Sequence, residues 1–270
     1  MIVVQGASSG IGLALVKHLL LRTTETIVAT SRTPERIYTA LEVEHQREGE
    51  CDRQSRSAYK DRFCAHEIDI TSEDSIAEIA RRVRSAYPTQ RLQALINVSG
   101  TLHVEKSLQQ TDMTSALQAY RTNTVSHLIM FKHFLPLVRN NNTGTSAQAA
   151  KPDKARQKSL LVSLSARTGS IHDNLSGGWY SYRSSKAALN QIIRTLGHEI
   201  RFKHLDAIAA AIHPGTVATN LSFGMTDRLP THHRVFSPDE SAARIWQVMQ
   251  ALNDEDNGSF LDWRGERILW

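Results

Sequence analysis

Residues 1–12, MIVVQGASSGIG, decide the fold of this chain. Residues 2–4 form a short apolar run that is rich in β-branched side chains and predicts a buried strand. The run leads into three glycines with the spacing G-x-x-x-G-x-G, at Gly6, Gly10 and Gly12. Glycines at this spacing predict a tight turn after the strand.

A helix is expected to follow the glycines, because apolar residues recur at helical spacing over residues 11–20. The order strand, turn and helix directs free main-chain N–H groups and the positive end of a helix dipole to one spot, where a phosphate can bind. Gly6 permits the tight turn, Gly10 allows close approach of a pyrophosphate, and Gly12 lets the helix pack on the strand. The stretch therefore predicts dinucleotide binding, with a turn that holds no ligand as the alternative.

The composition limits the class of protein. A chain of 270 residues, 40% of them hydrophobic, is long enough for one α/β domain with a large core. The net charge of +5 comes in good part from two polar stretches, and because no recognition motif accompanies it we expect no nucleic-acid partner. Cys51 and Cys64 have no C-x-x-C or metal-ligand spacing, which favours reduced thiols and no bound metal.

The beginning of the chain and its apolar runs predict the compartment. The first strand is expected to begin at residue 1, which leaves no room for a signal peptide. No apolar run reaches the length of a membrane span. We therefore expect a cytoplasmic protein without membrane contact.

Residues 1–270 are expected to form a single domain with surface insertions at about 47–62 and 140–158 and a small substrate lobe at about 220–237. After the first strand, strands are predicted at 26–31, 63–70, 92–97, 160–164, 206–212 and 260–263. Helices are predicted between them at 34–46, 72–87, 111–139 and 179–202, and a last one begins after Ser237 and Pro238. This alternation predicts a Rossmann-type α/β fold, a doubly wound parallel sheet of about seven strands with helices on both faces.

The residue that follows the second strand is expected to choose between NAD and NADP. An acidic residue there binds the ribose 2′-hydroxyl of NAD, whereas an arginine pairs with the 2′-phosphate of NADP. Residues 29–34 contain no acid, and Arg32 lies twenty residues after Gly12. We therefore predict NADP(H) in preference to NAD(H), although Ser9 leaves the glycine turn without a basic residue. A solvated loop arginine is the alternative.

A second decisive motif is Tyr182-x-x-x-Lys186, in YRSSKAAL, at the start of a predicted helix. Four residues make about one helical turn, so the two side chains share a face. A tyrosine that acts as a general acid near neutral pH needs a pKa below its usual ~10, and an adjacent ammonium group favours the phenolate. The same lysine can hydrogen-bond the ribose of a nicotinamide. An exposed pair of helix residues is the alternative.

Together these motifs resemble the short-chain dehydrogenase/reductase family of classical type, over almost the whole chain. Residues 169–190, GSIHDNLSGGWYSYRSSKAALN, are most similar to the C-factor and sniffer-type carbonyl reductases within it. The resemblance implies hydride transfer to or from a carbonyl or alcohol substrate, with Tyr182 as general acid/base and Lys186 lowering its pKa. It also implies that Asn123 leaves a carbonyl free to hold a water in a proton relay.

The resemblance implies where the cofactor binds. Asp69, at a strand end, contacts the adenine with Ile70 beside it; alternatively Asp69 or Thr71 caps the next helix, since Thr71-x-x-Asp74 resembles a capping box. Asn97 braces the central sheet, and Gly100 leaves room for a ribose. The implied cofactor-binding residues are Gly6, Ser8, Ser9, Gly10, Ile11, Gly12, Arg32, Asp69, Ile70, Asn97, Gly100, Tyr182, Lys186, Pro214, Gly215 and Thr219.

Two positions depart from the family pattern. Gln5 stands where the family usually has a threonine that ties down the glycine turn. The family's catalytic serine is the second residue of S-S-x-x-G, and alignment on Gly169 puts Ala166 in that position with Ser165 before it. Either Ser165 reaches the substrate oxygen, or the role is vacant, or another hydroxyl such as that of Ser170 takes it.

Three functions are compatible with these motifs. The first is an NADP(H)-dependent carbonyl reductase or alcohol dehydrogenase, which relatives suggest would form a homodimer or homotetramer. The second is a dinucleotide-binding signalling or regulatory protein of C-factor type with weak or no catalysis, which the alanine at position 166 makes conceivable. A sugar-nucleotide epimerase expects a different glycine spacing and a longer C-terminal domain, so the sequence disfavours it.

Overall fold

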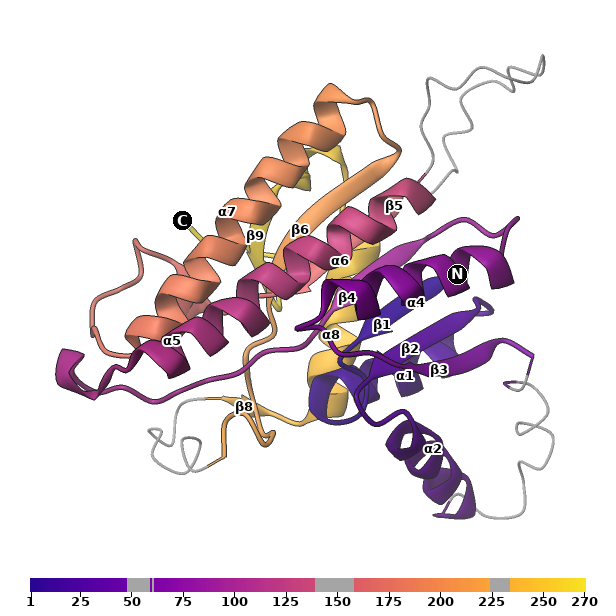
Figure 1. Cartoon of the computed structure of the whole chain (residues 1–270), viewed down its shortest axis with the longest axis horizontal. Helices are drawn as coiled ribbons and strands as arrows, with labels where there is room; N and C mark the ends of the chain where they lie inside the picture. The colour runs from indigo at the N-terminus through magenta and orange to yellow at the C-terminus, as the bar shows by residue number, and fades with distance from the viewer. Residues whose placement is uncertain (48–58, 60, 139–157, 224–233) are drawn as a thin grey trace.

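In the computed structural model, residues 1–47, 59, 61–138, 158–223 and 234–270 are described. They form a parallel seven-stranded sheet in the order β3-β2-β1-β4-β5-β6-β9 (Figure 1). Its strands are β1 (Ile2–Gln5), β2 (Ile27–Ser31), β3 (Phe63–Glu67), β4 (Ala94–Asn97), β5 (Ser159–Leu164), β6 (Ala207–His213) and β9 (Ser259–Asp262). The doubly wound sheet that the sequence predicts is therefore confirmed.

The helices are α1 (Gly10–Arg22), α2 (Glu35–Arg47), α4 (Glu73–Ala86), α5 (Met113–Tyr120), α6 (Ser126–Phe134), α7 (Tyr180–Phe202) and α8 (Pro238–Ala251). A small separate sheet pairs β7 (Thr216–Val217) with β8 (Val235–Phe236). The strand order reverses between β1 and β4, because the chain first builds outward through β2 and β3 and then returns to the other side of β1. Ligands of such sheets bind at the carboxyl ends of the strands near this point.

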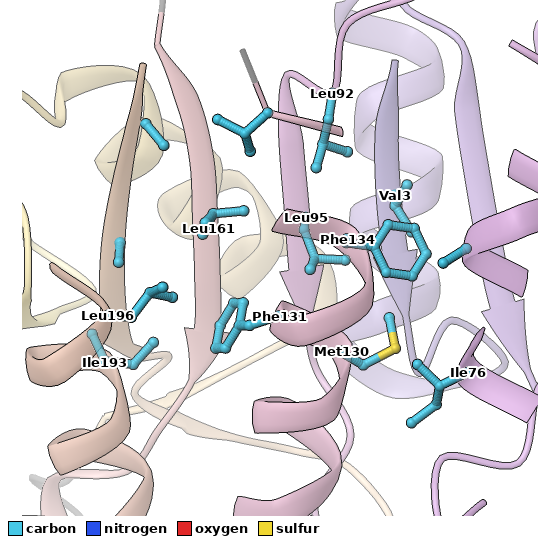
Figure 2. Packing of buried hydrophobic residues seen from close by; sticks show 14 of the residues in the cluster. Val3, Ile76, Leu92, Leu95, Met130, Phe131, Phe134, Leu161, Ile193 and Leu196 are labelled. Atoms are coloured by element: carbon cyan, nitrogen blue, oxygen red, sulfur yellow. The ribbon is translucent and has the colours of Figure 1, made fainter. Parts of the chain in front are cut away.

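One face of the sheet is covered by α4, α6 and α7. Successive strand residues point to opposite faces, so Val3, Leu95 and Leu161 face these helices from three neighbouring strands. Figure 2 shows Phe131 and Phe134 of α6 packed among them. Burying such aromatic side chains contributes a few kcal/mol each to folding, and it fixes α6 and α7 over the centre of the sheet.

The opposite face is covered by α1 and α8. Ile2 and Val4 of β1 point to this side and meet Leu15 of α1 in a second apolar cluster. Ile245 of α8 belongs to the same cluster. The molecule thus has the predicted three layers, and α1 begins at the carboxyl end of β1, where the glycine turn lies.

The predicted helix at 111–139 is divided in the structure. A π turn at Arg121–Val125 separates α5 from α6, and a 3-10 turn at Leu135–Leu137 follows α6. The sequence pattern remains helical through the π turn, so periodicity alone could not reveal it. The turn contains the buried side chain of Asn123, whose hydrogen bonds are described below.

The sequence predicted the residues that cap two helices, and the structure confirms one of these caps. Thr71 is not the cap of α4, because Ser72 accepts the capping hydrogen bond from the main-chain N of Ser75. The Asp69 carboxylate instead accepts from Thr71, which closes a turn before the helix. Ser237 caps α8 as predicted, in a capping box with Glu240.

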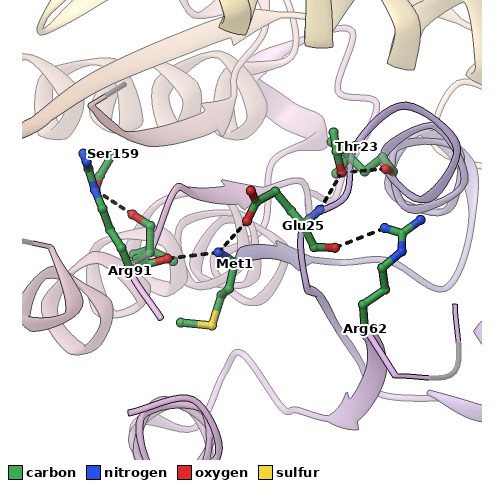
Figure 3. A network of polar contacts seen from close by, with 8 residues as sticks. Met1, Thr23, Glu25, Arg62, Arg91 and Ser159 are labelled. Carbon is green, nitrogen blue, oxygen red and sulfur yellow. Dashed lines mark hydrogen bonds and ion pairs between the residues drawn. The ribbon is translucent and has the colours of Figure 1, made fainter. Parts of the chain in front are cut away.

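A polar network closes the amino-terminal ends of the strands (Figure 3). The Met1 ammonium group donates to the Glu25 carboxylate and to the Arg91 carbonyl, each at 3.0 Å. Arg91 also forms an ion pair with Asp206 at 3.1 Å. Because this edge is opposite to the carboxyl ends of the strands, we interpret it as structural.

Part of the predicted organisation lies outside the described residues. The insertions predicted at about 47–62 and 140–158 and most of the substrate lobe at about 220–237 fall there. Among the helices that are described, none is both long and apolar enough to cross a membrane.

Candidate active site

The glycine turn lies between β1 and α1, with Ser8 and Ser9 inside it. Gly6 adopts φ +85°, a left-handed conformation that favours glycine. A Cβ atom at Gly12 would overlap the Gly6 carbonyl oxygen, so the turn packs against the helix as expected. At the start of α1 the Ser9 side chain makes no capping bond, and the first turn contains no acid. Its N–H groups therefore remain suited to an anion.

Gln5 shows how the turn is held without the family's threonine. Its side chain is buried; Nε2 donates to Ser99 Oγ at 2.6 Å, and Oε1 accepts from the Ser99 main-chain N at 3.3 Å. A Cβ atom at Gly6 would lie 2.6 Å from Ser99 Oγ. The Gln5 side chain thus joins the end of β1 to Ser99, in the turn that follows β4.

Arg32 and Asp69 lie near each other at the ends of β2 and β3. Arg32 is exposed directly after β2. The pKa of the Asp69 carboxyl is lowered by its hydrogen bonds from the Thr71 hydroxyl and main chain, and further by the charges of Arg121 and Arg32. Ile70 packs against the core beside them. The structure therefore groups the residues predicted for the adenosine end of a cofactor.

Asn97 at the end of β4 does not brace the sheet through its side chain, contrary to expectation. The amide is fully buried, and neither of its polar atoms has a hydrogen-bond partner among the described residues. Gly100 lies at the back of the site: a Cβ atom there would be 3.4 Å from Asn123 Oδ1 and 3.6 Å from Lys186 Nζ. Gly100 thus lies between two of the predicted site residues, and a methyl group there would be in ordinary contact with both.

Asn123 is fully buried within the π turn. Its Oδ1 accepts from the Thr101 main-chain N at 2.7 Å, and its Nδ2 donates to the Thr101 carbonyl at 2.9 Å and to Ser185 Oγ at 3.0 Å. The turn closes with a bond from Ser126 N to the Arg121 carbonyl, one residue longer than in an α-helix. The side chain thereby links the loop after β4 to α7.

Tyr182 and Lys186 lie one turn apart near the start of α7, and both are buried, at 7% and 3% exposure. Lys186 Nζ donates to the Leu164 carbonyl at the end of β5, at 2.8 Å. The same nitrogen lies 6.0 Å from the centre of the Tyr182 ring. The predicted pair therefore converges at the carboxyl end of the sheet, beside Asn123 and Gly100.

Burial dominates the acidity of both groups. It raises the pKa of Tyr182 to about 12 and lowers the pKa of Lys186 to about 7. The expected lowering of the tyrosine pKa by the lysine is therefore not what this structure contains. The reason is desolvation, which disfavours the phenolate and the ammonium alike. At neutral pH the phenol keeps its proton, and the lysine amine exchanges protons readily.

The position of the family's serine is the main departure in the site. Ser165 Oγ donates to Asn190 Oδ1 at 2.6 Å in a buried bond, and Asn190 in turn donates to the Gly169 carbonyl at 3.3 Å. Ser170 Oγ donates to the Leu269 carbonyl. A hydroxyl has one proton to donate, so both serines have already used theirs, and Ala166 has none.

Pro214, Gly215 and Thr219 form the wall after β6. A Cβ atom at Gly215 would lie 2.6 Å from the Phe236 ring, so this turn is tightly packed. A Cβ atom at Gly10 would meet Thr219 Cγ2 at 3.2 Å. The structure thus brings the Pro-Gly segment and the glycine turn together, as the motif order predicts.

The sequence analysis missed His127, which is fully buried on α6. Its Nε2 lies 2.9 Å from the Ser99 carbonyl and its Nδ1 lies 2.9 Å from Ser163 Oγ. Because a carbonyl only accepts, we assign the proton to Nε2, with Ser163 donating to Nδ1. Burial, with the charge of Lys186, lowers the pKa of His127 to about 3. The feature of the sequence that could have pointed to His127 is its position four residues after Asn123, which places both on one face of a helix.

The comparisons with known proteins agree with this geometry. The family model described as short chain dehydrogenase matches residues 1–228. An uncharacterized oxidoreductase of Schizosaccharomyces pombe is 28% identical over 98% of this chain and 96% of its own. The C-signal protein of Myxococcus xanthus is 28% identical over 67% of this chain and 95% of its own.

Two solved structures are similar over the full length of the chain. NADPH-bound carbonyl reductase from chicken fatty liver has a TM-score of 0.79 and 27% identity, covering 100% of this chain and 98% of that one. Carbonyl reductase Sniffer of D. melanogaster has a TM-score of 0.78 and 23% identity with the same coverage, which supports the fold. The resemblance to sniffer-type and C-factor proteins is therefore confirmed.

The buried His127 predicts an acid-dependent loss of stability. Unfolded His127 binds a proton below pH 6.5, whereas the folded residue does so only near pH 3, so the free energy of unfolding falls as pH drops through this range. Between pH 7 and pH 5 His127 accounts for a loss of about 2 kcal/mol. Urea unfolding of wild type and His127→Asn at both pH values measures it. The exposed His198→Asn should follow wild type, and equal pH slopes for wild type and His127→Asn would contradict the assignment.

Proposed function

The chain belongs to the short chain dehydrogenase family, and on that premise we propose that it is an NADP(H)-dependent oxidoreductase that interconverts a carbonyl and an alcohol. One observation carries the proposal: Tyr182 and Lys186 converge with Asn123 at the carboxyl end of β4 and β5, beside an uncapped helix N-terminus. A general acid next to a nicotinamide site is what carbonyl reduction requires.

The residues present fit a nicotinamide dinucleotide. The open N–H groups of α1 and the glycine turn suit its diphosphate, and Gly100, which has no side chain beside Lys186, is where we expect a ribose. Pro214 and Thr219 close the opposite side. When bound, the cofactor supplies or accepts the hydride. The NADPH in the similar chicken reductase supports this cofactor class.

Tyr182 supplies the proton. With its pKa raised to about 12 by burial, the phenol is protonated at neutral pH, which is the form that a carbonyl oxygen needs in order to become a hydroxyl. Lys186, with a pKa near 7, can return a proton to the phenolate after transfer. Asn123, in the π turn and near Lys186 across Gly100, is the residue that we expect to support a water relay to solvent.

Arg32 supports NADP(H) over NAD(H). It is exposed at the end of β2, where a ribose 2′-group would lie. Its charge helps to lower the pKa of the nearby Asp69 carboxyl. A guanidinium group forms strong paired hydrogen bonds with a phosphate. The expected homodimer or homotetramer has support in α5, which leaves Met113 and Leu117 exposed one turn apart.

A second function rests on the hydroxyl groups of the site. Ser165 is committed to Asn190, and Ala166 cannot donate, so the oxygen of a substrate lacks one stabilising donor. Loss of one such donor costs on the order of 10²–10³ in rate. A dinucleotide-binding signalling protein with weak catalysis is consistent with this site and with the similarity to C-signal.

Tyr182→Phe tests the reaction. We expect turnover to fall by about 10²–10⁴ while NADPH still binds, because only the proton donor is lost. NADPH oxidation is measured against a panel of reactive aldehydes and ketones, with cofactor affinity measured by fluorescence. Tyr180→Phe, at the exposed tyrosine two residues earlier, is the matched control. Undiminished turnover in Tyr182→Phe would refute the role. Tight NADPH binding with no turnover by wild type would favour the signalling function.

Arg32→Ala tests the cofactor preference. The Kd for NADPH should rise about tenfold or more, as expected for losing a charged hydrogen bond worth roughly 1.5–3 kcal/mol. The Kd for NADH should stay unchanged, because NADH has no 2′-phosphate. Arg36→Ala, at an exposed arginine in the first turn of α2, is the control. A parallel loss of both cofactors would argue against a phosphate contact.

Ala166→Ser tests the vacant donor. Restoring the family's serine should raise kcat by about tenfold or more, because a donor to a developing oxyanion is regained. Steady-state kinetics with the best carbonyl of the panel measure the change, and Ser165→Ala is compared in parallel. If Ala166→Ser has no effect and Ser165→Ala abolishes turnover, Ser165 is the donor.

A further inference from the structure

Glu105 is a buried acid that the proposed reaction does not use. It lies in the loop between β4 and α5 and is only 3% exposed. Its carboxylate accepts a hydrogen bond from the Ser181 main-chain N at 2.8 Å and a second from the Ser181 hydroxyl. The two residues are 76 positions apart in the sequence, and Ser181 directly precedes Tyr182. A buried carboxylate is costly unless it is fully hydrogen-bonded, so this contact needs a reason.

Helix α7 has no cap of its own. The residue before it is Trp179, whose side chain makes no capping bond, and its first turn contains no acid. The positive end of a helix dipole is stabilised by a negative charge, and its first N–H groups need acceptors. Glu105 meets both needs from a distant loop.

The main chain of Glu105 holds the same segment. Its carbonyl accepts from Trp179 N at 2.6 Å, and a Cβ atom at Gly178 would lie 3.2 Å from that oxygen. Trp179 has φ 52° and ψ 46°, a left-handed conformation that costs a non-glycine residue about 1–2 kcal/mol. Strained residues persist where neighbouring contacts fix them. Glu105 provides such contacts at the main-chain N of Trp179 and at Ser181, two residues later.

Trp179 carries this restraint to Tyr182. The two rings pack edge to face, with centres 6.3 Å apart and planes at 76°. On α7 the Lys186 Nζ lies 6.0 Å from the centre of the same tyrosine ring. The phenol is therefore held between Trp179, which Glu105 fixes, and Lys186, which the Leu164 carbonyl fixes.

The loop that carries Glu105 also contacts the other parts of the site. Four residues earlier, the main chain of Thr101 exchanges hydrogen bonds with the Asn123 side chain. Ser99 accepts a hydrogen bond from Gln5, at the end of β1 just before the glycine turn, and Glu105 takes no part in this bond. A loss at Glu105 should thus disturb the tyrosine and leave the cofactor turn in place.

We propose that Glu105 is a positioning residue: by holding Trp179 and Ser181 it sets the first turn of α7 and thereby the placement of the Tyr182 phenol. The inference rests on the proposed function for its effect on turnover. Its structural half, the restraint on the first turn of α7, stands independently of any reaction. Reacting groups must be placed closely, since a displacement of about 1 Å can cost on the order of 10²-fold in rate.

The test compares Glu105→Ala and Glu105→Gln with wild type by steady-state kinetics. We expect Glu105→Ala to lower kcat by about 10- to 100-fold, with KM for NADPH within about twofold, because Gln5 and Ser99 keep the glycine turn. Glu105→Gln keeps one acceptor and should lose less. Glu199→Gln, which removes a partly buried acid near the other end of α7 that pairs with Lys203, should match wild type.

Hydrogen exchange supplies a readout that does not depend on turnover. The amides of residues 181–183 should exchange faster in Glu105→Ala than in wild type, with the strands unchanged. If Glu105→Ala does not fold, Ser181→Ala replaces it, since that variant loses only the hydroxyl bond and should show the same changes to a smaller degree.

The outcomes separate the two proposals. Unchanged kcat and unchanged exchange in the Glu105 variants would overturn the positioning role while the reductase function stands. A rise in KM for NADPH with kcat unchanged would also overturn it, because that result assigns Glu105 to cofactor binding. If wild type has no turnover with any carbonyl, the proposed function fails, and the exchange of residues 181–183 still decides whether Glu105 holds the helix.

Discussion

The hydrogen bond from Lys186 Nζ to the Leu164 carbonyl, at 2.8 Å, joins α7 to the end of the central sheet, and the rest of the site is arranged around it. Two glycines lie close to the lysine side chain. A Cβ atom at Gly169 would lie 2.8 Å from Lys186 Cβ, and one at Gly100 would lie 3.6 Å from Nζ. The close packing of Lys186 thus accounts for a glycine at position 169, and the bond lies one helical turn from Tyr182.

The same burial sets the electrostatics of the site. Desolvation lowers the pKa of Lys186 to about 7, and the charge of Lys186 in turn lowers the pKa of the buried His127. His127 stays neutral because burial and the charge of Lys186 lower its pKa, although the hydrogen bond to the Ser99 carbonyl acts in the opposite direction. Among the described residues no carboxylate pairs with Lys186, whose amine donates to the Leu164 carbonyl. An interior that avoids fixed charge in this way suits a group that must gain and lose a proton in each cycle.

Much of the fold was predictable, because it follows from local patterns. The apolar run at residues 2–4, the glycine turn and the alternation of strands and helices predicted the parallel sheet, and the motif order placed Tyr182 and Lys186 at its carboxyl edge. The contacts that complete the site were not predictable, since each joins distant segments: Gln5 with Ser99, and Glu105 with Ser181. No periodicity encodes such pairs. The prediction that Lys186 lowers the pKa of Tyr182 was wrong for a related reason. The sequence indicated a charged lysine one helical turn away, but not how deeply the pair is buried.

The serine that this chain lacks shows how these contacts depend on one another. In this structure the Ser165 hydroxyl donates to Asn190, and Asn190 in turn donates to the carbonyl of Gly169, a residue that packs against Lys186. Turning Ser165 toward a substrate would leave a buried amide oxygen unpaired, at a cost of about 1–3 kcal/mol. The arrangement therefore keeps the Ser165 hydroxyl on Asn190. We expect turnover to depend on the placement of the Tyr182 phenol, which we propose that the loop at Glu105 sets.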